Sequence, residues 1–273
     1  MSRLSVALVT YRTEASMLAR TLDSLARAVQ EARTAGLMDE CHVFVIDNGP
    51  EDERARTADV LRAWPPEAGA IEVLQGHGNV GYGRANNLVL ERLRSDVHLI
   101  LNPDVEIAAH ALAAALRALI EHPEVGLVAP AVFDERGERQ YLCKRFPSAW
   151  VLFLRGFAPR VLRERFRRTL AEYEMRDAIG ERFLTGVPLA SGCFMLVRTE
   201  LFRRLGGFDP RFFLYFEDYD LSLRVGREAS IAYVPEARIV HHGGEASRKG
   251  WRHVAWFVRS ASRFYARHGW KLF

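Results

Sequence analysis

The chain has 273 residues, of which 49% are hydrophobic and 26% are charged, and Lys and Arg outnumber Asp and Glu by 38 to 34. This is the composition of an ordinary globular protein and excludes an intrinsically disordered chain. The basic excess is too small and too scattered to indicate a nucleic-acid-binding protein, but it suits an anionic small molecule or an anionic membrane surface. At this length one α/β domain over residues 1–273 is expected.

Three widely spaced cysteines without a C-x-x-C pair predict neither a disulfide framework nor a zinc site, and they favour a reducing cytoplasm. The apolar run Leu4 to Thr10 is too short for a signal-peptide core and is interpreted as a first strand. Arginines interrupt the longest hydrophobic stretches, so no membrane-spanning segment is expected. We therefore expect a cytoplasmic protein, either soluble or peripheral at the inner face of the membrane.

Apolar runs of strand length alternate with amphipathic helical patterns through the first half of the chain. Strands are predicted at 4–10, 42–46, 71–74 and 97–101, and helices at 18–29, 54–64, 85–93 and 108–120. The alternation predicts a Rossmann-like α/β fold, with a mainly parallel sheet and helices on both faces. The second half is less regular, with strands at 193–197 and 231–234 and helices after Thr199, at 217–225 and at 251–268.

Polar residues follow several predicted strands at their carboxyl ends: Thr10, Tyr11, Asp47, Asn102 and Asp104. Ligands of such sheets bind beyond these ends, so we expect the side chains to share one crevice. Asn102 and Asp104 supply oxygens two residues apart, which can hold a divalent cation that bridges a diphosphate. The alternative is that Asp47 belongs only to a turn and Asp104 only caps a helix.

Two further polar motifs lie in the second half. Glu217 and Asp218 follow a run of aromatic and apolar residues at a predicted helix start. They either cap that helix or provide a carboxylate in a partly dry pocket, as a general base requires. His241 and His242 follow a strand-like segment and are either structural or the source of a further metal ligand.

The segment Gly76-His77-Gly78-Asn79-Val80-Gly81 is formally a G-x-G-x-x-G motif between a strand and a helix. Such a motif typifies a nicotinamide-dependent oxidoreductase when it occupies the first turn between strand and helix. Here the first such turn is Thr10-Tyr11-Arg12-Thr13, which has no glycine. The dinucleotide interpretation therefore remains an alternative rather than the favoured hypothesis.

Taken in order, the motifs resemble the inverting family 2 glycosyltransferases of the GT-A fold, and among them the rhamnosyltransferase-like bacterial branch. The resemblance extends from about Val6 to about Ser247, although Arg12 stands where the family usually has Asn. It rests on Val9-Thr10-Tyr11, Val45 to Gly49, Gly78 to Asn87, Leu101-Asn102-Pro103-Asp104, Ser191 to Met195, Gly206 to Asp209, Phe213 to Leu221, and His241 to Gly244.

The resemblance implies a nucleotide-sugar-binding half at 1–122 and an acceptor and catalytic-base half with C-terminal helices at 123–273. It implies that Asp218 and Glu217 are the catalytic residues, with Asp218 as the base, and that Asp104 and His241 hold Mg²⁺ or Mn²⁺, with His241 favoured over His242. The residues expected to bind the sugar donor are Thr10, Tyr11, Asp47, Asn79, Gly81, Asn102, Asp104 and Gly192.

The implied reaction is the transfer of a sugar from a nucleotide-diphosphate donor to a hydroxyl of a glycan or lipid-linked acceptor, with inversion at the anomeric carbon. The branch that is resembled suggests L-rhamnose from dTDP-rhamnose. A catalytically silent nucleotide-sugar-binding protein is a further alternative, which the presence of Asp104 and Asp218 disfavours. The basic, aromatic segments at 150–170 and 251–273 are either solvated helices or a contact with a membrane surface.

Overall fold

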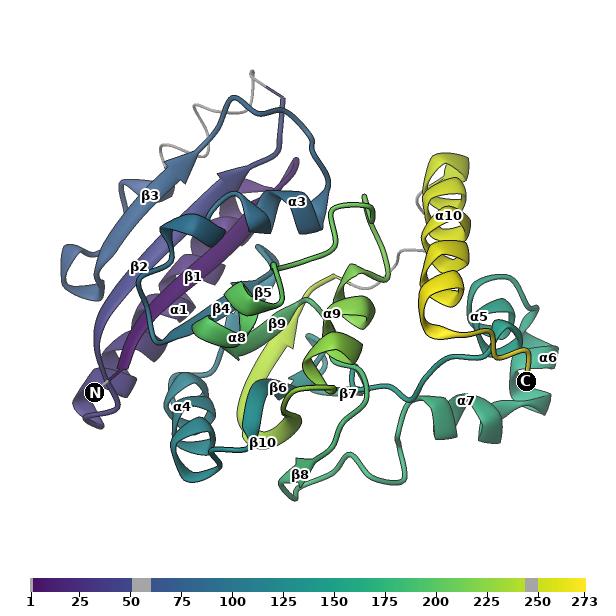
Figure 1. Ribbon diagram of the computed structural model, residues 1–273. Helices are drawn as coiled ribbons and strands as arrows, with labels where there is room; N and C mark the ends of the chain where they lie inside the picture. Colours follow the sequence, from purple (N-terminus) through teal and green to yellow (C-terminus); the bar gives the residue numbers. More distant parts are fainter. Residues whose placement is uncertain (1, 51–59, 244–249) are drawn as a thin grey trace.

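The structure is a computed structural model that describes residues 2–50, 60–243 and 250–273 (Figure 1). Most of the helix predicted at 54–64 lies outside the described residues. The described strands form one ten-stranded sheet, to which both halves of the chain contribute. Its main path runs through β3 (Ala70–Leu74), β2 (Met38–Asp47), β1 (Ser2–Thr10), β4 (Val97–Leu101), β9 (Phe194–Arg198), β6 (Val125–Phe133), β10 (Ser230–His241) and β5 (Val105–Ile107).

The first four strands of this path are mutually parallel, as the sequence predicts. The rest of the sheet mixes directions, because β9 runs antiparallel to both β4 and β6. β10 is parallel to β6 and antiparallel to β5. Two short strands lie off the main path: β7 (Arg139–Gln140) pairs with β6, and β8 (Leu184–Thr185) pairs with β10.

Helices cover both faces of the sheet, because alternate residues of each strand point to opposite sides. In β1, for example, Leu4, Val6 and Leu8 pack in the core under α1 and α4, whereas Ala7 and Val9 pack under α3, α8 and α9. The helices are α1 (Ala15–Thr34), α3 (Tyr82–Asn87), α4 (Ala111–Glu121), α5 (Ala149–Gly156), α6 (Arg160–Arg165), α7 (Arg167–Tyr173), α8 (Thr199–Arg204), α9 (Glu217–Val225) and α10 (Gly250–His268). Short 3₁₀ turns lie at Pro66–Ala68 and Leu90–Arg92.

The sequence analysis did not predict β5, β6, β7 or β8, and it predicted a shorter β10; proline is involved in β6 and in β10. β6 was not predicted, since Pro130 stands in its middle; in the sheet, this residue is paired with Val234 of β10. β10 extends well beyond the predicted 231–234, because the register shifts between Val234 and Arg238, across Pro235, and pairing then resumes. A bulge of this kind lets a strand continue past a residue that has no N–H to donate.

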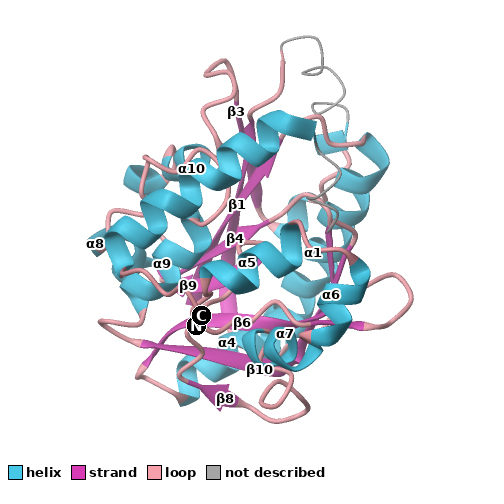
Figure 2. Ribbon diagram, turned by 90° about the vertical axis from the view of Figure 1, so that its right-hand side faces the viewer, coloured by secondary structure: helices cyan, strands magenta, loops and turns pink. Residues whose placement is uncertain are grey.

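A third packing cluster joins α5, α9 and α10, on the side of the molecule that faces the viewer in Figure 2. Its buried members are Leu152, Phe212, Phe216, Phe264 and Tyr265. In the part of the chain that the structure describes, every helix is too short or too polar to cross a membrane.

Candidate functional site

A cleft of about 1140 Å³ opens at the carboxyl ends of β1 and β4. Five residues that the sequence predicts to bind the sugar donor line it: Tyr11, Asn79, Gly81, Asn102 and Asp104. The cleft lies where open parallel sheets bind ligands, beyond the strand ends. Thr10, Asp47, Gly192, Glu217, Asp218 and His241 are close by in the fold but do not line this cleft.

Asp47 and Thr10 end neighbouring parallel strands and contact each other, with Thr10 Oγ1 donating to Asp47 Oδ1 at 3.3 Å. The same oxygen accepts the Gly49 N–H at 2.9 Å, while Asp47 Oδ2 is buried without a hydrogen-bond partner. A buried carboxylate oxygen left in this state is costly unless a ligand donates to it. The next residue, Asn48, lines the cleft and was not predicted as a site residue.

The glycine-rich loop packs against the loop that leads into α9. Gly81 has φ +89°, and a Cβ there would lie 2.4 Å from the carbonyl oxygen of Phe213. That carbonyl accepts the Tyr82 N–H at 3.0 Å, and Asn79 Oδ1 accepts the Gly81 N–H at 3.1 Å. The N–H of Tyr82, the first residue of the short α3, is therefore bonded within the protein and is not available to a dinucleotide pyrophosphate.

Asp104 and His241 lie together because β5 pairs with the end of β10, with His241 opposite Val105. His241 Nε2 is 3.6 Å from Asp104 Oδ1, an oxygen that is buried without a hydrogen-bond partner. Gly243 makes the close approach possible, since a Cβ there would lie 2.2 Å from Asp104 Oδ2. Burial lowers the pKa of His241, although the charge of Asp104 opposes this, so the imidazole tends to be neutral, as a metal ligand must be.

His242 lines the cleft, but its side chain has a different set of partners. Its Nε2 is 2.8 Å from Glu106 Oε1 and its Nδ1 is 2.6 Å from Glu135 Oε1. The structure therefore separates the two histidines: His241 meets Asp104, and His242 is held between two glutamates. Within residues 2–50, 60–243 and 250–273, no three His, Cys, Asp or Glu side chains are grouped as a metal-binding set.

Asp218, at the start of α9, is held by two backbone N–H groups. Gly192 donates to Oδ2 at 3.0 Å and Tyr219 donates to Oδ1 at 2.9 Å. Desolvation raises the pKa of Asp218, while these two N–H groups lower it. Gly192 is in turn linked to the cleft, because the hydroxyl of Tyr82, a lining residue, donates to its carbonyl at 2.8 Å.

Glu217 has a drier environment than Asp218. It is only 5% exposed, and its Oε2 has no hydrogen-bond partner. Desolvation, and then the charge of Asp218, raise its pKa to about 8. Burial therefore favours the protonated form of Glu217 at neutral pH; it raises the pKa of Asp218 as well, but there the two backbone N–H groups oppose it and favour the carboxylate.

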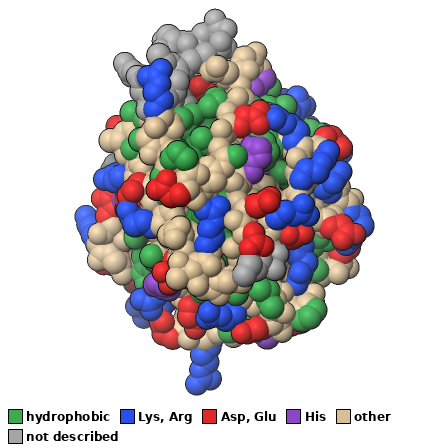
Figure 3. Space-filling model, turned by 90° about the vertical axis from the view of Figure 1, so that its left-hand side faces the viewer, with side chains coloured by type: hydrophobic (Ala, Val, Ile, Leu, Met, Phe, Trp, Pro, Cys, Tyr) green, Lys and Arg blue, Asp and Glu red, His purple; other side chains and the backbone are tan. Residues whose placement is uncertain are grey.

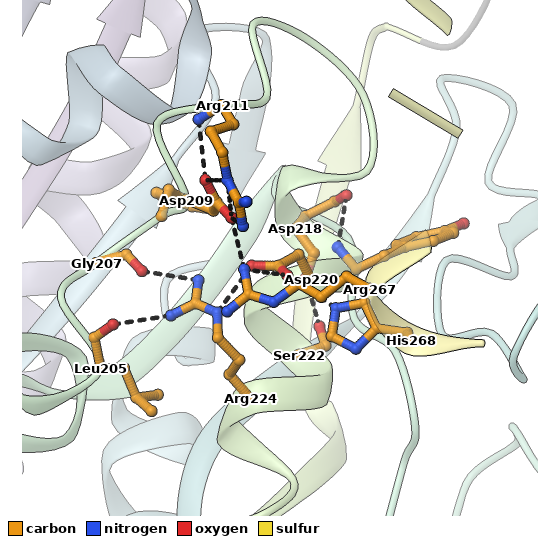
Figure 4. A network of polar contacts seen from close by, with 12 residues as sticks. Leu205, Gly207, Asp209, Arg211, Asp218, Asp220, Ser222, Arg224, Arg267 and His268 are labelled. Atoms are coloured by element: carbon orange, nitrogen blue, oxygen red, sulfur yellow. Dashed lines mark hydrogen bonds and ion pairs between the residues drawn. The ribbon is translucent and has the colours of Figure 1, made fainter. Parts of the chain in front are cut away.

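A buried ion-pair network holds α9 beneath the carboxyl pair (Figure 4). Asp220 is fully buried and accepts from Arg224 Nε at 2.8 Å, with His268 Nε2 at 2.8 Å and Arg267 at 3.0 Å on its other oxygen. Arg267 also pairs with Asp209. The C-terminal end of α10 is thus tied to the helix that carries Asp218.

The other end of α10 lines the cleft with residues that the sequence analysis did not assign to the site: Gly250, Trp251, Arg252, His253 and Trp256. These residues are far from β1 in the sequence, and only the tertiary fold brings this end of α10 close to the carboxyl end of β1. Two residues of the loop before α9, Phe213 and Leu214, line the cleft as well, and Phe213 packs on Trp256 with ring centroids 4.9 Å apart.

Comparison with known proteins agrees with this geometry. The sequence model of "Glycosyl transferase family 2" matches residues 5–206. The chain is similar to the N-acetylglucosaminyl-diphospho-decaprenol L-rhamnosyltransferase of Mycobacterium tuberculosis, with 31% identity over 84% of this chain and 76% of the relative. It is also similar to rhamnosyltransferase WbbL of Escherichia coli, with 28% identity over 70% of this chain and 72% of the relative.

A solved structure shares the fold across nearly the whole chain. The crystal structure of GalNAc-T7 with UDP, GalNAc and Mn²⁺ superposes with a TM-score of 0.65, at 17% identity, over 97% of this chain and 50% of that one. The sheet with its surrounding helices is thus the GT-A arrangement that the sequence resemblance implies. The chain belongs to glycosyl transferase family 2 and is a glycosyltransferase whose relatives include rhamnosyltransferases.

Proposed function

We propose that this enzyme transfers L-rhamnose from dTDP-rhamnose to a hydroxyl of a lipid-linked glycan, with inversion at the anomeric carbon. One observation carries the assignment of the chemistry: Asp104, which pairs with His241, lines the strand-end cleft, and the lining residue Tyr82 links the same cleft to the Asp218 carboxylate through Gly192. The sugar and the type of acceptor rest on the name of the Mycobacterium tuberculosis relative.

The residues fit a divalent cation. The orphaned Oδ1 of Asp104 and the neutral His241 would hold it, with Asn102 nearby on the cleft wall. Bound there, the cation would act as a Lewis acid that stabilises the charge on the departing nucleotide diphosphate. Asp47, with its unpartnered Oδ2, would receive a hydrogen bond from the nucleotide base, next to Thr10 and Tyr11.

Asp218 would take the proton from the acceptor hydroxyl as that oxygen attacks the anomeric carbon. The C–O bond to the diphosphate breaks as the new glycosidic C–O bond forms on the opposite face of the sugar. The backbone N–H groups of Gly192 and Tyr219 favour the ionised form of this carboxyl group and fix its position. A single displacement needs no carboxylate nucleophile, unlike hydrolysis with retention.

A membrane contact would bring a lipid-linked acceptor to the site. Residues 149–173 and 250–273 together contain eleven Lys or Arg and two Glu, a net charge of +9, so the remaining residues carry −5 of the total of +4. In Figure 2 these elements occupy the face toward the viewer, whereas acidic and basic side chains intermingle on the opposite face in Figure 3. The basic face also exposes apolar side chains: Phe153, Phe157, Val161, Trp251, Trp270 and Phe273. Such a mixture suits the surface of an anionic bilayer.

The test is a transfer assay with dTDP-rhamnose, UDP-N-acetylglucosamine and GDP-mannose, each with a polyprenyl diphosphate N-acetylglucosamine acceptor. We expect product only from dTDP-rhamnose, only with Mg²⁺ or Mn²⁺, and with an inverted anomeric centre by NMR. Thermal unfolding with dTDP, UDP, GDP and NAD⁺ provides a second measurement, since a bound ligand stabilises the native state. Stabilisation by NAD⁺ alone would overturn the proposal.

A further inference from the structure

Three basic side chains, which lie near α9, the helix that carries Asp218, pair with a single carboxylate, that of Glu174. Glu174 pairs with Arg176 at 2.6 Å, Lys144 at 3.6 Å and Arg155 at 3.8 Å. Lys144 is almost fully buried, and desolvation, followed by the charge of Arg155, lowers its pKa to about 7. A single carboxylate does not balance this group, so the cluster is short of negative charge.

Two tyrosines link the cluster to the segment that carries Asp218. Tyr219, the residue after the base, has its hydroxyl 2.8 Å from that of Tyr173, and the Arg155 guanidinium carbon is 5.5 Å from the Tyr173 ring centroid. Leu152, one turn before Arg155 on α5, packs in the same cluster as Phe216 of the loop into α9. Desolvation raises the pKa values of both tyrosines, and the charge of Asp218 adds to this in each case, which agrees with this linkage.

Among the three cations, Arg155 is the one suited to a ligand. The side chain of Lys144 is only 4% exposed, and its Nζ also bonds to the carbonyl of Tyr141. Arg176 holds Glu174 through two nitrogens and lies over the Tyr141 ring. The Arg155 side chain is 40% exposed and makes the longest of the three contacts with Glu174.

We propose that Arg155, backed by Tyr173, binds a phosphate of the acceptor's diphosphate and thereby places the acceptor sugar at Asp218. This proposal rests on the proposed function, because it presumes an acceptor linked through a diphosphate. Arginine suits the role, since its guanidinium forms paired hydrogen bonds with phosphate oxygens. Phe153 and Phe157, two residues before and two residues after Arg155, are exposed and would give an apolar surface beside the phosphate.

The experiment compares two acceptors that carry the same sugar, one as a prenyl diphosphate and one as a neutral octyl glycoside. For Arg155→Gln we expect the KM of the diphosphate acceptor to rise at least about tenfold, as for the loss of a charged hydrogen bond, while the KM values of the octyl glycoside and of the sugar donor stay unchanged. Arg155→Lys should recover part of the loss. Arg163→Gln, which removes the same charge from α6, should behave as the wild type.

An equal loss with both acceptors would overturn the proposal and show that Arg155 has a purely structural role. An unchanged KM for the diphosphate acceptor would overturn it too. Binding of geranyl diphosphate in EDTA, by calorimetry with excess dTDP, tests the site without turnover and should weaken in Arg155→Gln only. If this variant instead loses binding to phosphatidylglycerol vesicles but not to geranyl diphosphate, the phosphate recognised is a membrane headgroup. A wild-type enzyme that transfers to neither acceptor would contradict the proposed function itself.

Discussion

The backbone N–H of Gly192 donates to Oδ2 of Asp218 at 3.0 Å, and this contact joins the end of the central sheet to the helix that carries the proposed base. The peptide of Gly192 is in turn held by Tyr82 from the cleft wall, through its carbonyl. The backbone of Gly192 thus positions the Asp218 carboxylate, and the side chain of Tyr82 positions Gly192.

Replacing Asp218 by Asn retains the shape of the side chain but removes the proton acceptor. We expect the Asp218→Asn enzyme to lose at least about a hundredfold in kcat, within the range for general bases, while the affinity for the nucleoside diphosphate remains nearly unchanged. Steady-state kinetics and calorimetric titration with dTDP and Mn²⁺ measure the two quantities. Equal loss of both would argue against Asp218 as the base.

Removing either proposed metal ligand should weaken binding of the sugar donor only when metal is present. For Asp104→Ala and His241→Ala we expect the Mn²⁺-dependent rise in melting temperature with dTDP to shrink or vanish. His242→Ala is the matched control, because His242 faces Glu106 and Glu135 rather than Asp104. A variant at Asp104 with an unchanged response to metal would exclude that residue from the cation site.

Gly81→Ala should destabilise the protein by distorting the loop against Phe213. The positive φ costs about 1–2 kcal/mol for an L-residue, and the clash with the Phe213 carbonyl adds about 1–3 kcal/mol. Gly137→Ala is the control, since φ there is +77° but a Cβ would meet no atom within 4 Å. Urea unfolding should show a clearly larger loss in the free energy of unfolding for Gly81→Ala, and equal losses would contradict the packing described.

The raised pKa of Glu217 predicts how the stability of the protein depends on pH. Its pKa in the folded protein is raised to about 8 from an ordinary value near 4.5, so the folded state holds a proton that the unfolded chain has released. This stabilisation is complete below pH 4.5 and is lost as the pH rises toward 8. The neutral Glu217→Gln variant should therefore melt at a higher temperature than the wild type at pH 8, and this advantage should disappear near pH 4.5. A constant difference across that range would show that Glu217 does not titrate as described.

The parallel half of the fold could be predicted because each of its strands is a continuous apolar run. The sequence pattern failed where a local signal contradicted the tertiary outcome, as with Pro130 inside β6 and Pro235 inside β10. It also failed for α10, whose place beside the cleft depends on packing against α9, far from β1 in the sequence. No periodicity encodes that contact.

The residues that line the cleft could be predicted from the sequence to a similar extent. Residues that directly follow strands, such as Tyr11 and Asn102, could be expected at the cleft from the topology alone. The partnership of Asp104 with His241 followed only from the family resemblance, because it depends on β5 pairing with β10. Nothing in the sequence distinguished His241 from His242 as clearly as their different partners do.

The pairing of β5 with β10 also has a consequence for folding. Glu106 and His242, which meet across it, are 136 residues apart in the chain, so the neighbouring Asp104–His241 pair can form only after a contact of very high sequence separation. Such contacts are slow to form because a long loop must first close. Loading of cation and nucleotide should therefore be among the last events in maturation, and affinity for them should report the fully assembled sheet rather than its early, parallel half.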